Sequence, residues 1–132
     1  MSGGIKVMIV EDDDAVRDGL HILIDGSDGY ECIAACPTAE EALSIIPQNF
    51  PQVVLMDINL PGMNGIECVV GIKNMWPEIQ VMMLTVFDNT EEIFKSLTAG
   101  ATGYLLKKTQ PAKLLEAITE LVNGGSPMSG EI

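Results

Sequence analysis

The stretch VVLMDINLPGMNG, residues 53–65, decides the fold of this chain. Its first four residues, 53–56, are all apolar, which is typical of a strand buried on both faces of a parallel sheet. The run ends at one carboxylate, Asp57, and ligands of open α/β sheets bind just beyond the carboxyl ends of the strands. The Leu-Pro-Gly that follows at 60–62 predicts a tight turn. Asp57 is therefore either the cap of a turn or an acid placed for chemistry.

Composition limits the classes of protein to which the chain can belong. It has 132 residues, 47% of them hydrophobic, which is enough for one domain with a core. No apolar run approaches the roughly 20 residues of a membrane helix, and the N-terminal MSGGIK lacks the features of a signal peptide. The net charge of −12 opposes direct binding to nucleic acid. We expect a cytoplasmic protein with no membrane partner.

Apolar runs alternate with helical patterns along the whole chain. The runs predict strands over 6–10, 30–36, 53–56, 79–84 and 102–106. The patterns between and after them predict helices over about 14–25, 38–46, 64–76, 89–100 and 111–122. Five strand–helix units of this kind indicate an α/β fold with a parallel sheet covered on both faces. The pattern alone does not fix the order of the strands.

Polar side chains follow the predicted strands at the point where each strand ends. Glu11 and Asp12 follow the first strand, Asp57 the third, Thr85 the fourth and Lys107 the fifth. Because the carboxyl ends of parallel strands meet at one edge of the sheet, we expect these groups to lie close together.

The chemistry of this set of groups points to phosphoryl transfer. Oxygen ligands without His or Cys suit Mg²⁺, which prefers one or two carboxylates, waters and a phosphate oxygen. A Lys ammonium binds phosphate as a point charge, and an Asp carboxylate can itself accept a phosphoryl group. Positioning and charge neutralisation are most of what phosphoryl transfer requires. The sequence therefore predicts Mg²⁺-assisted phosphorylation of Asp57.

These residues, in this order, resemble the receiver domain of two-component response regulators over about residues 5–123. The family's motif positions are matched by Glu11 and Asp12, Asp57 within MDINLPGMNG, Thr85, Tyr104, and Lys107 in GYLLK. The resemblance implies a flavodoxin-like (βα)5 receiver fold with a five-stranded parallel sheet in the order 2-1-3-4-5.

The resemblance also implies a metal site. Asp12 and Asp57 would ligate Mg²⁺ directly, and Glu11 would do so directly or through water. The main-chain carbonyl of Asn59 would complete the protein ligands.

A switch is implied as well. Asp57 would take the phosphoryl group from a phosphohistidine of a sensor histidine kinase, and Lys107 and Thr85 would bind its oxygens. Thr85 would then move toward the phosphate and let Tyr104 turn inward, which changes the face made by the fourth helix, fifth strand and fifth helix or builds a homodimer. Such a chain is not an enzyme beyond its own phosphorylation and dephosphorylation.

The last residues, GGSPMSGEI, resemble the linker of NarL/LuxR-type transcription regulators. We expect residues 1–124 to form the receiver domain and residues 125–132 to begin a linker. The linker would lead to an absent C-terminal helix-turn-helix domain, and DNA would be contacted only through that domain.

Three positions depart from the family pattern. Glu11 stands where Asp is commoner, so its carboxylate lies one methylene further out. Val86 follows Thr85 where a small residue is usual, and its β-branched side chain could crowd the phosphoryl pocket. Lys108 stands where many receivers have Pro, and it could compete with Lys107 for the phosphate. The order of residues in GYLLK favours Lys107.

Other functions are compatible with parts of this pattern. A haloacid-dehalogenase-type phosphatase also carries a nucleophilic Asp after a strand, but it needs a second Asp where this chain has Asn59. A flavodoxin-like binding module needs a phosphate loop after the first strand, where this chain has the acidic EDDD. A pseudo-receiver that signals without phosphorylation is the third alternative, and the complete set of motif residues argues against it.

Overall fold

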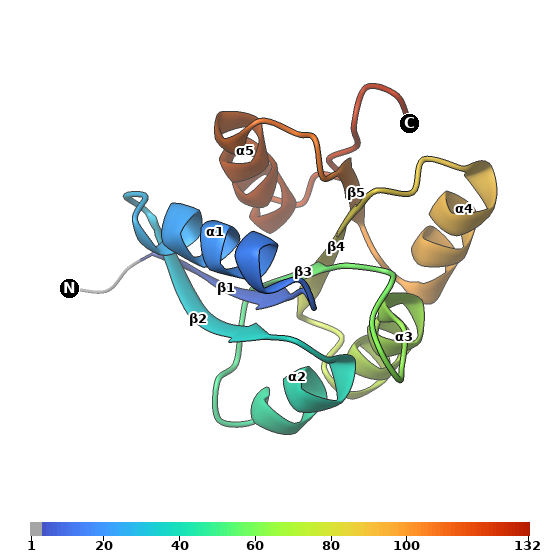
Figure 1. Ribbon diagram of the computed structural model, residues 1–132, viewed down its shortest axis with the longest axis horizontal. Helices are drawn as coiled ribbons and strands as arrows, with labels where there is room; N and C mark the ends of the chain where they lie inside the picture. The colour runs from blue at the N-terminus through green and yellow to red at the C-terminus, as the bar shows by residue number, and fades with distance from the viewer. Residues whose placement is uncertain (1–3) are drawn as a thin grey trace.

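The computed structural model describes residues 4–132, and within them strands and helices alternate strictly (Figure 1). The strands are β1 (Ile5–Val10), β2 (Tyr30–Cys36), β3 (Val53–Met56), β4 (Gln80–Thr85) and β5 (Gly103–Leu106). The helices are α1 (Asp14–Asp25), α2 (Ala39–Ile45), α3 (Gly65–Met75), α4 (Thr90–Ala99) and α5 (Pro111–Val122). All strand pairs are parallel, and their order is β2-β1-β3-β4-β5. The predicted fold class and strand order are confirmed, with element ends displaced by about one residue.

Helices cover both faces of the sheet and bury it completely at its centre (Figure 1). On one face, α1 and α5 pack over Ile9 and Leu55, with Ile118 of α5 in the same cluster. On the other face, α2, α3 and α4 pack over a second cluster that contains Met83 and Ile72. Every residue of β3 and of β5 is buried. The unbroken apolar runs therefore encode strands with two buried faces, as parallel sheets require.

The turn after β3 is held tightly against the sheet. A Cβ atom at Gly65 would collide with the main-chain oxygen of Asp57, so only glycine lets α3 begin this close to the strand end. Asn64 and Glu67 form a capping box, in which each side chain accepts a hydrogen bond from the other residue's main-chain N–H. Gly62, in the predicted tight turn, adopts a positive φ of +72°. The loop that carries Asp57 into α3 is thus fixed by local sequence.

The three cysteines are free and buried. Burial raises the pKa of the Cys32 thiol to about 11 and those of Cys36 and Cys68 to about 12. Thiols this far from ionisation at neutral pH are poor nucleophiles. Their role is therefore packing.

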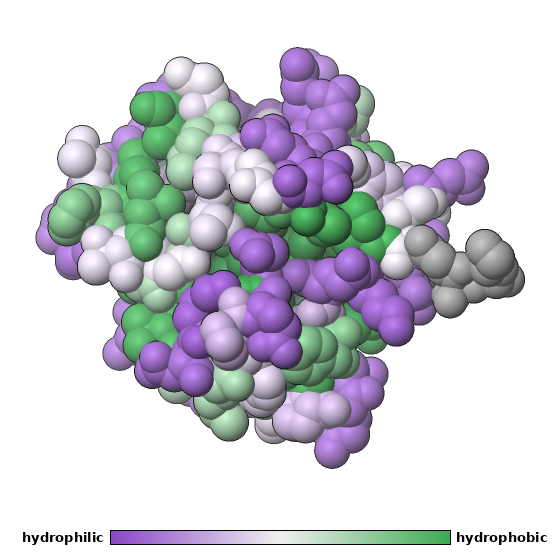
Figure 2. All heavy atoms as spheres, turned by 180° about the vertical axis from the view of Figure 1, so that it is seen from behind, coloured by the Kyte–Doolittle hydropathy of each residue, from purple (hydrophilic) through white to green (hydrophobic). Residues whose placement is uncertain are grey.

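The surface mixes hydrophilic and hydrophobic residues, and green side chains gather toward the side of α3 and α4 in the rear view (Figure 2). Among the large exposed hydrophobic residues there, Val70 is 43%, Met75 66% and Phe94 68% exposed. Phe94 and Val70 line a shallow apolar groove between the two helices. Within residues 4–132, no helix has the length and apolarity to cross a membrane.

Candidate functional site

Three carboxylates converge where β1 and β3 end side by side. These strands pair in parallel, with Val10 opposite Met56, so the residues that follow them, Glu11 and Asp57, become neighbours. One carboxylate oxygen from each of Glu11, Asp12 and Asp57 lies within 4.8 Å of the others. The predicted acidic cluster at this edge of the sheet is therefore present.

Lys107 reaches this cluster from β5, two strands away. Its Nζ lies 2.6 Å from Glu11 Oε1 and 2.9 Å from Asp57 Oδ2, and so joins the two carboxylates. The Lys107 main-chain N–H donates to the carbonyl of Thr85 at 2.8 Å, which ties the end of β5 to the end of β4. The parallel register thus delivers the ammonium to the same point as the acids.

Burial and charge shift the protonation of these groups in definite directions. Glu11 is only 2% and Asp57 5% exposed, whereas Asp12 is exposed. Burial raises the pKa of Glu11, and the hydrogen bond from Lys107 offsets part of that rise. Burial alone would lower the pKa of Lys107, but its hydrogen bonds to Glu11 and Asp57 outweigh that effect and raise it. Lys107 is therefore a permanent cation at neutral pH.

The charge of the cluster is unbalanced in favour of a bound cation. Three carboxylates face one ammonium, and two of the three are nearly inaccessible to water. Oxygen donors without His or Cys are the set that Mg²⁺ prefers. The exposed Asp12 leaves the cluster open to solvent on one side, so an ion can retain waters there. These residues fit a Mg²⁺ site.

Main-chain and side-chain hydrogen bonds hold the acids in place. Asp57 Oδ1 accepts from the N–H of Ile58 at 2.8 Å, and Glu11 Oε2 accepts from the N–H of Asp13 at 3.1 Å. Both buried carboxylates therefore have one oxygen on Lys107 and one on the backbone. Such a set of partners fixes the rotamers without neutralising the cluster.

Arg17 is a supporting residue that the sequence analysis did not identify. Its Nη1 donates to the main-chain oxygens of Glu11, at 2.9 Å, and Asp12, at 3.4 Å. Its Nη2 pairs with Asp14 Oδ1 at 2.6 Å. The i,i+3 spacing of Asp14 and Arg17 on one helix was the available signal. Arg17 holds the acidic loop at the start of α1.

The remaining predicted residues occupy different depths around the cluster. Thr85 is the last residue of β4 rather than the residue after it, and it is fully buried. Its Oγ1 accepts from the N–H of Phe87 at 3.4 Å. Asn59 lies in the exposed loop two residues after Asp57. Asn59 stays a predicted ligand through its main-chain carbonyl.

Tyr104 points into the protein. Its side chain has no exposed surface, and its hydroxyl donates to the main-chain oxygen of Phe87 at 2.7 Å. Burial, followed by the nearby carboxylates of Glu92 and Asp88, raises the pKa of Tyr104 to about 12. The ring thus contacts the loop that begins at Thr85. The inward position expected of a switched receiver is the one that this structure has.

Val86 and Lys108, two of the departures from the family pattern, have different surroundings. The side chain of Val86 is 67% exposed. Lys108 pairs with Glu131 at 3.0 Å, while Lys107 alone of the two contacts Glu11 and Asp57. The prediction that Lys107 rather than Lys108 faces the acids is confirmed.

Comparison with known proteins identifies the family. The family described as the response regulator receiver domain matches residues 7–119 of this chain. The chain belongs to this receiver family. The "Nitrate/nitrite response regulator protein homolog" of Haemophilus influenzae is 32% identical across the whole chain, which covers 64% of that protein. The transcriptional regulatory protein MctR of Rhizobium johnstonii is 34% identical over 97% of the chain and 60% of its own length.

Solved structures agree with this assignment. A two-component response regulator of the LuxR family from Aurantimonas sp. SI85-9A1 superposes with a TM-score of 0.92 at 32% identity. The match covers 98% of the receiver chain and 92% of that protein's chain. The predicted resemblance to LuxR-type response regulators is confirmed. The chain spans less than two thirds of the length of the two curated relatives named above.

Proposed function

We propose that this chain is the phosphoacceptor receiver of a transcriptional response regulator, and that Asp57 accepts the phosphoryl group from a sensor histidine kinase. The single observation that carries the proposal is the buried Asp57 carboxylate bound to Lys107 Nζ at 2.9 Å, with Glu11 and Asp12 beside it. Few structural roles need two buried acids, one exposed acid and one lysine at one point. Phosphoryl transfer uses groups of these kinds to position the reactants and to neutralise charge.

The reaction follows from the positions of these groups. A carboxylate oxygen of Asp57 attacks the phosphorus of a phosphohistidine, so that a P–O bond forms as the P–N bond breaks. The electron pair of the broken bond leaves with the imidazole. Lys107 then binds an oxygen of the transferred group, and the hydroxyl of Thr85 donates a hydrogen bond to another. Mg²⁺ held by Glu11, Asp12, Asp57 and the carbonyl of Asn59 would neutralise charge on the phosphoryl oxygens.

The wider role is proposed on the same basis. Phosphorylation would bias Thr85 and Tyr104, and through them the α4–β5–α5 face or a homodimer. We propose that residues 1–124 act as the receiver and that residues 125–132 begin the linker to a C-terminal helix-turn-helix domain. DNA would be bound only by that domain, in the cytoplasm. The chain would catalyse only its own phosphorylation and dephosphorylation.

The proposal is tested by intact mass measurement after incubation with Mg²⁺ and acetyl phosphate. The parent protein should gain the mass of one phosphoryl group, and Asp57→Asn should gain none. Adding a chelator should abolish the gain in the parent. A gain in both proteins would mean that another residue is the acceptor. No gain in the parent, repeated with a sensor kinase as donor, would leave the pseudo-receiver as the better description.

The phosphatase alternative is not favoured. Its required second acid is replaced by Asn59, which lies in an exposed loop. Turnover of a phosphomonoester, measured as release of inorganic phosphate beyond one equivalent, would be needed to revive it.

A further inference from the structure

The residues after α5 turn back toward the sheet. Helix α5 ends in a Schellman motif, in which the N–H of Gly124 donates to Leu121 O at 3.1 Å and the N–H of Gly125 to Glu120 O at 2.9 Å. Gly124 adopts a φ of +94°, which favours glycine. Because α5 runs antiparallel to β5, this reversal sends residues 125–132, hereafter the tail, back alongside β5 in the parallel direction.

The tail pairs with the outer edge of β5 through one parallel bridge. The N–H of Tyr104 donates to Pro127 O at 2.9 Å, and the N–H of Ser129 donates to Tyr104 O at 3.0 Å. These bonds make a parallel bridge between Tyr104 and Met128. The N–H of Leu106 donates to Ser129 Oγ at 2.9 Å. The outer edge of β5, which would otherwise be open to pairing with another chain, is therefore satisfied by the protein itself.

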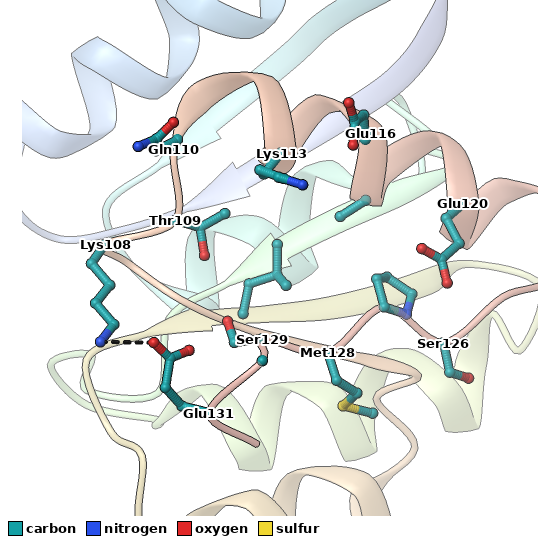
Figure 3. Close-up of a pocket in the computed structure, with 14 residues that line it drawn as sticks. Lys108, Thr109, Gln110, Lys113, Glu116, Glu120, Ser126, Met128, Ser129 and Glu131 are labelled. Atoms are coloured by element: carbon teal, nitrogen blue, oxygen red, sulfur yellow. Dashed lines mark ion pairs between the residues drawn. The ribbon is translucent and has the colours of Figure 1, made fainter.

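Packing agrees with the hydrogen bonds. Pro127 is buried, and a Cβ atom at Gly103 would lie 2.9 Å from Met82 Cγ and 3.2 Å from Pro127 Cγ. Glycine at this position leaves room for both side chains. Figure 3 shows Met128 and Ser129 beside β5, with an open groove between the tail and α5. At the far end of the tail, Glu131 pairs with Lys108 at 3.0 Å. The contact is thus spread over the length of the tail.

The residue that binds the tail is also the buried tyrosine. Tyr104 gives its main-chain N–H and C=O to the tail and its hydroxyl to Phe87 O, in the loop after Thr85. Tyr104 and Met128 are directly paired, and directly paired residues of neighbouring strands carry their side chains on the same face of the sheet. A ring that swung out past the edge of β5 would enter the space of the docked tail. The docked tail and the inward ring therefore favour each other.

We propose that the tail can detach from β5, and that its docking there is coupled to the inward position of Tyr104. This inference rests on the proposed function for its second half: phosphorylation of Asp57, which favours the inward ring, also tightens the tail. The coupling is reciprocal, so a docked tail stabilises the phosphorylated state by the same factor. Whatever chain follows residue 132 is held near the β5 edge in that state and freed when the tail leaves.

The docking half is tested with two matched glycine variants. A side chain at Gly124 or at Gly130 meets nothing within 4 Å, but only Gly124 has a positive φ. Gly124→Val should raise the amide exchange rates of Tyr104 and Ser129, measured by NMR, by about tenfold, because a non-glycine residue at positive φ is strained. Gly130→Val should leave them within about twofold of the parent. Equal rates in all three proteins would overturn the docking.

The coupling half is tested by adding Mg²⁺ and beryllofluoride, a phosphoryl mimic, to the parent. The amide signal of Ile58, which donates to Asp57, reports binding at the site. With binding, the amide exchange of Ser129 should slow by at least about threefold, and Tyr104→Ala should lose this slowing. Binding without any slowing would overturn the coupling and leave the proposed function intact. If the Ile58 signal did not move, the mimic would not bind, and both the coupling and the proposed function would be overturned. The glycine variants would still decide whether the tail docks on β5.

Discussion

Two lysines at opposite ends of the sheet are held in contrasting ways. Lys73, in the last turn of α3, lies at the amino end of β4, and its Nζ donates to the carbonyl oxygens of Pro77 and Ile79, both at 2.8 Å. Lys107, at the carboxyl end of β5, binds the carboxylates of Glu11 and Asp57. Burial lowers the pKa of Lys73, whereas the carboxylates raise that of Lys107.

The difference separates a contact that only holds the structure from one that the proposed function requires. Carbonyl dipoles satisfy the hydrogen bonds of Lys73 and pin the loop between α3 and β4, and they bring no net charge that calls for a further partner. The acids around Lys107 exceed it in charge, so a further cation near them would stabilise that end of the sheet. An excess of buried charge, more than the burial of a lysine, is what marks the functional end of this sheet.

Removing the Lys107 ammonium should have the largest effect. Lys107→Met leaves Glu11 and Asp57 buried beside each other without their shared partner. We expect the free energy of unfolding to fall by about 3 kcal/mol in the presence of a chelator, measured by urea denaturation. Mg²⁺ should restore most of this loss, because it binds the folded state preferentially. A loss that is the same with and without Mg²⁺ would show that the cluster holds no cation.

Tyr104, near the carboxyl end of the sheet, gives a second test through the pKa of its hydroxyl. Burial and nearby acids raise the pKa of Tyr104 to about 12. A group whose folded-state pKa is raised contributes stability below its ordinary pKa of 10.0 and loses it as the pH rises toward 12. In an ultraviolet titration, Tyr104→Phe should lose the phenolate absorbance that develops near pH 12, and Tyr30→Phe should keep it. Loss of that absorbance from Tyr30→Phe instead would contradict the assignment.

The alternation of strands and helices and most of the cluster could be predicted because both follow from short-range patterns. The order of the strands came from the family resemblance. Apolar runs that end in Glu11, Asp57 and Lys107 define buried parallel strands, and parallel strands bring their carboxyl ends to one edge. The same argument separated Lys107 from Lys108 by position alone. The predicted fourth strand ended one residue too early, because the pairing with β5 extends β4 through Thr85.

The parts that could not be predicted depend on contacts between distant segments. The Gly, Ser and Pro residues of the tail indicate a linker, and nothing local shows that Pro127 fits over Gly103 or that Ser129 caps the N–H of Leu106. The hydrogen bond from Arg17 to the main-chain carbonyl of Glu11 likewise depends on where α1 packs. For Ser129 and Arg17 the deciding partner is a main-chain group, which every residue type carries and sequence does not distinguish.

A smaller effect is expected at the opposite end of the sheet. Lys73→Met removes two hydrogen bonds to the carbonyls of Pro77 and Ile79. Unfolding free energy should fall by about 1–2 kcal/mol, with no recovery when Mg²⁺ is added. The same urea titrations used for Lys107→Met supply the measurement. If Mg²⁺ also restored the unfolding free energy of Lys73→Met, the two lysines would not differ as proposed, because the ion would then stabilise the fold in general.

The smallest effect belongs to Lys108, the neighbour of Lys107 in sequence. Its side chain is 68% exposed and pairs with Glu131, itself 52% exposed, so solvent screens the pair. Lys108→Met should change the unfolding free energy by less than about 0.5 kcal/mol, and its response to Mg²⁺ should match that of the parent. The variant makes the same side-chain change as Lys107→Met one position away. If it lost stability in a Mg²⁺-dependent way, a general loss of positive charge near the acids, rather than the contact of one ammonium with two carboxylates, would explain the behaviour of Lys107.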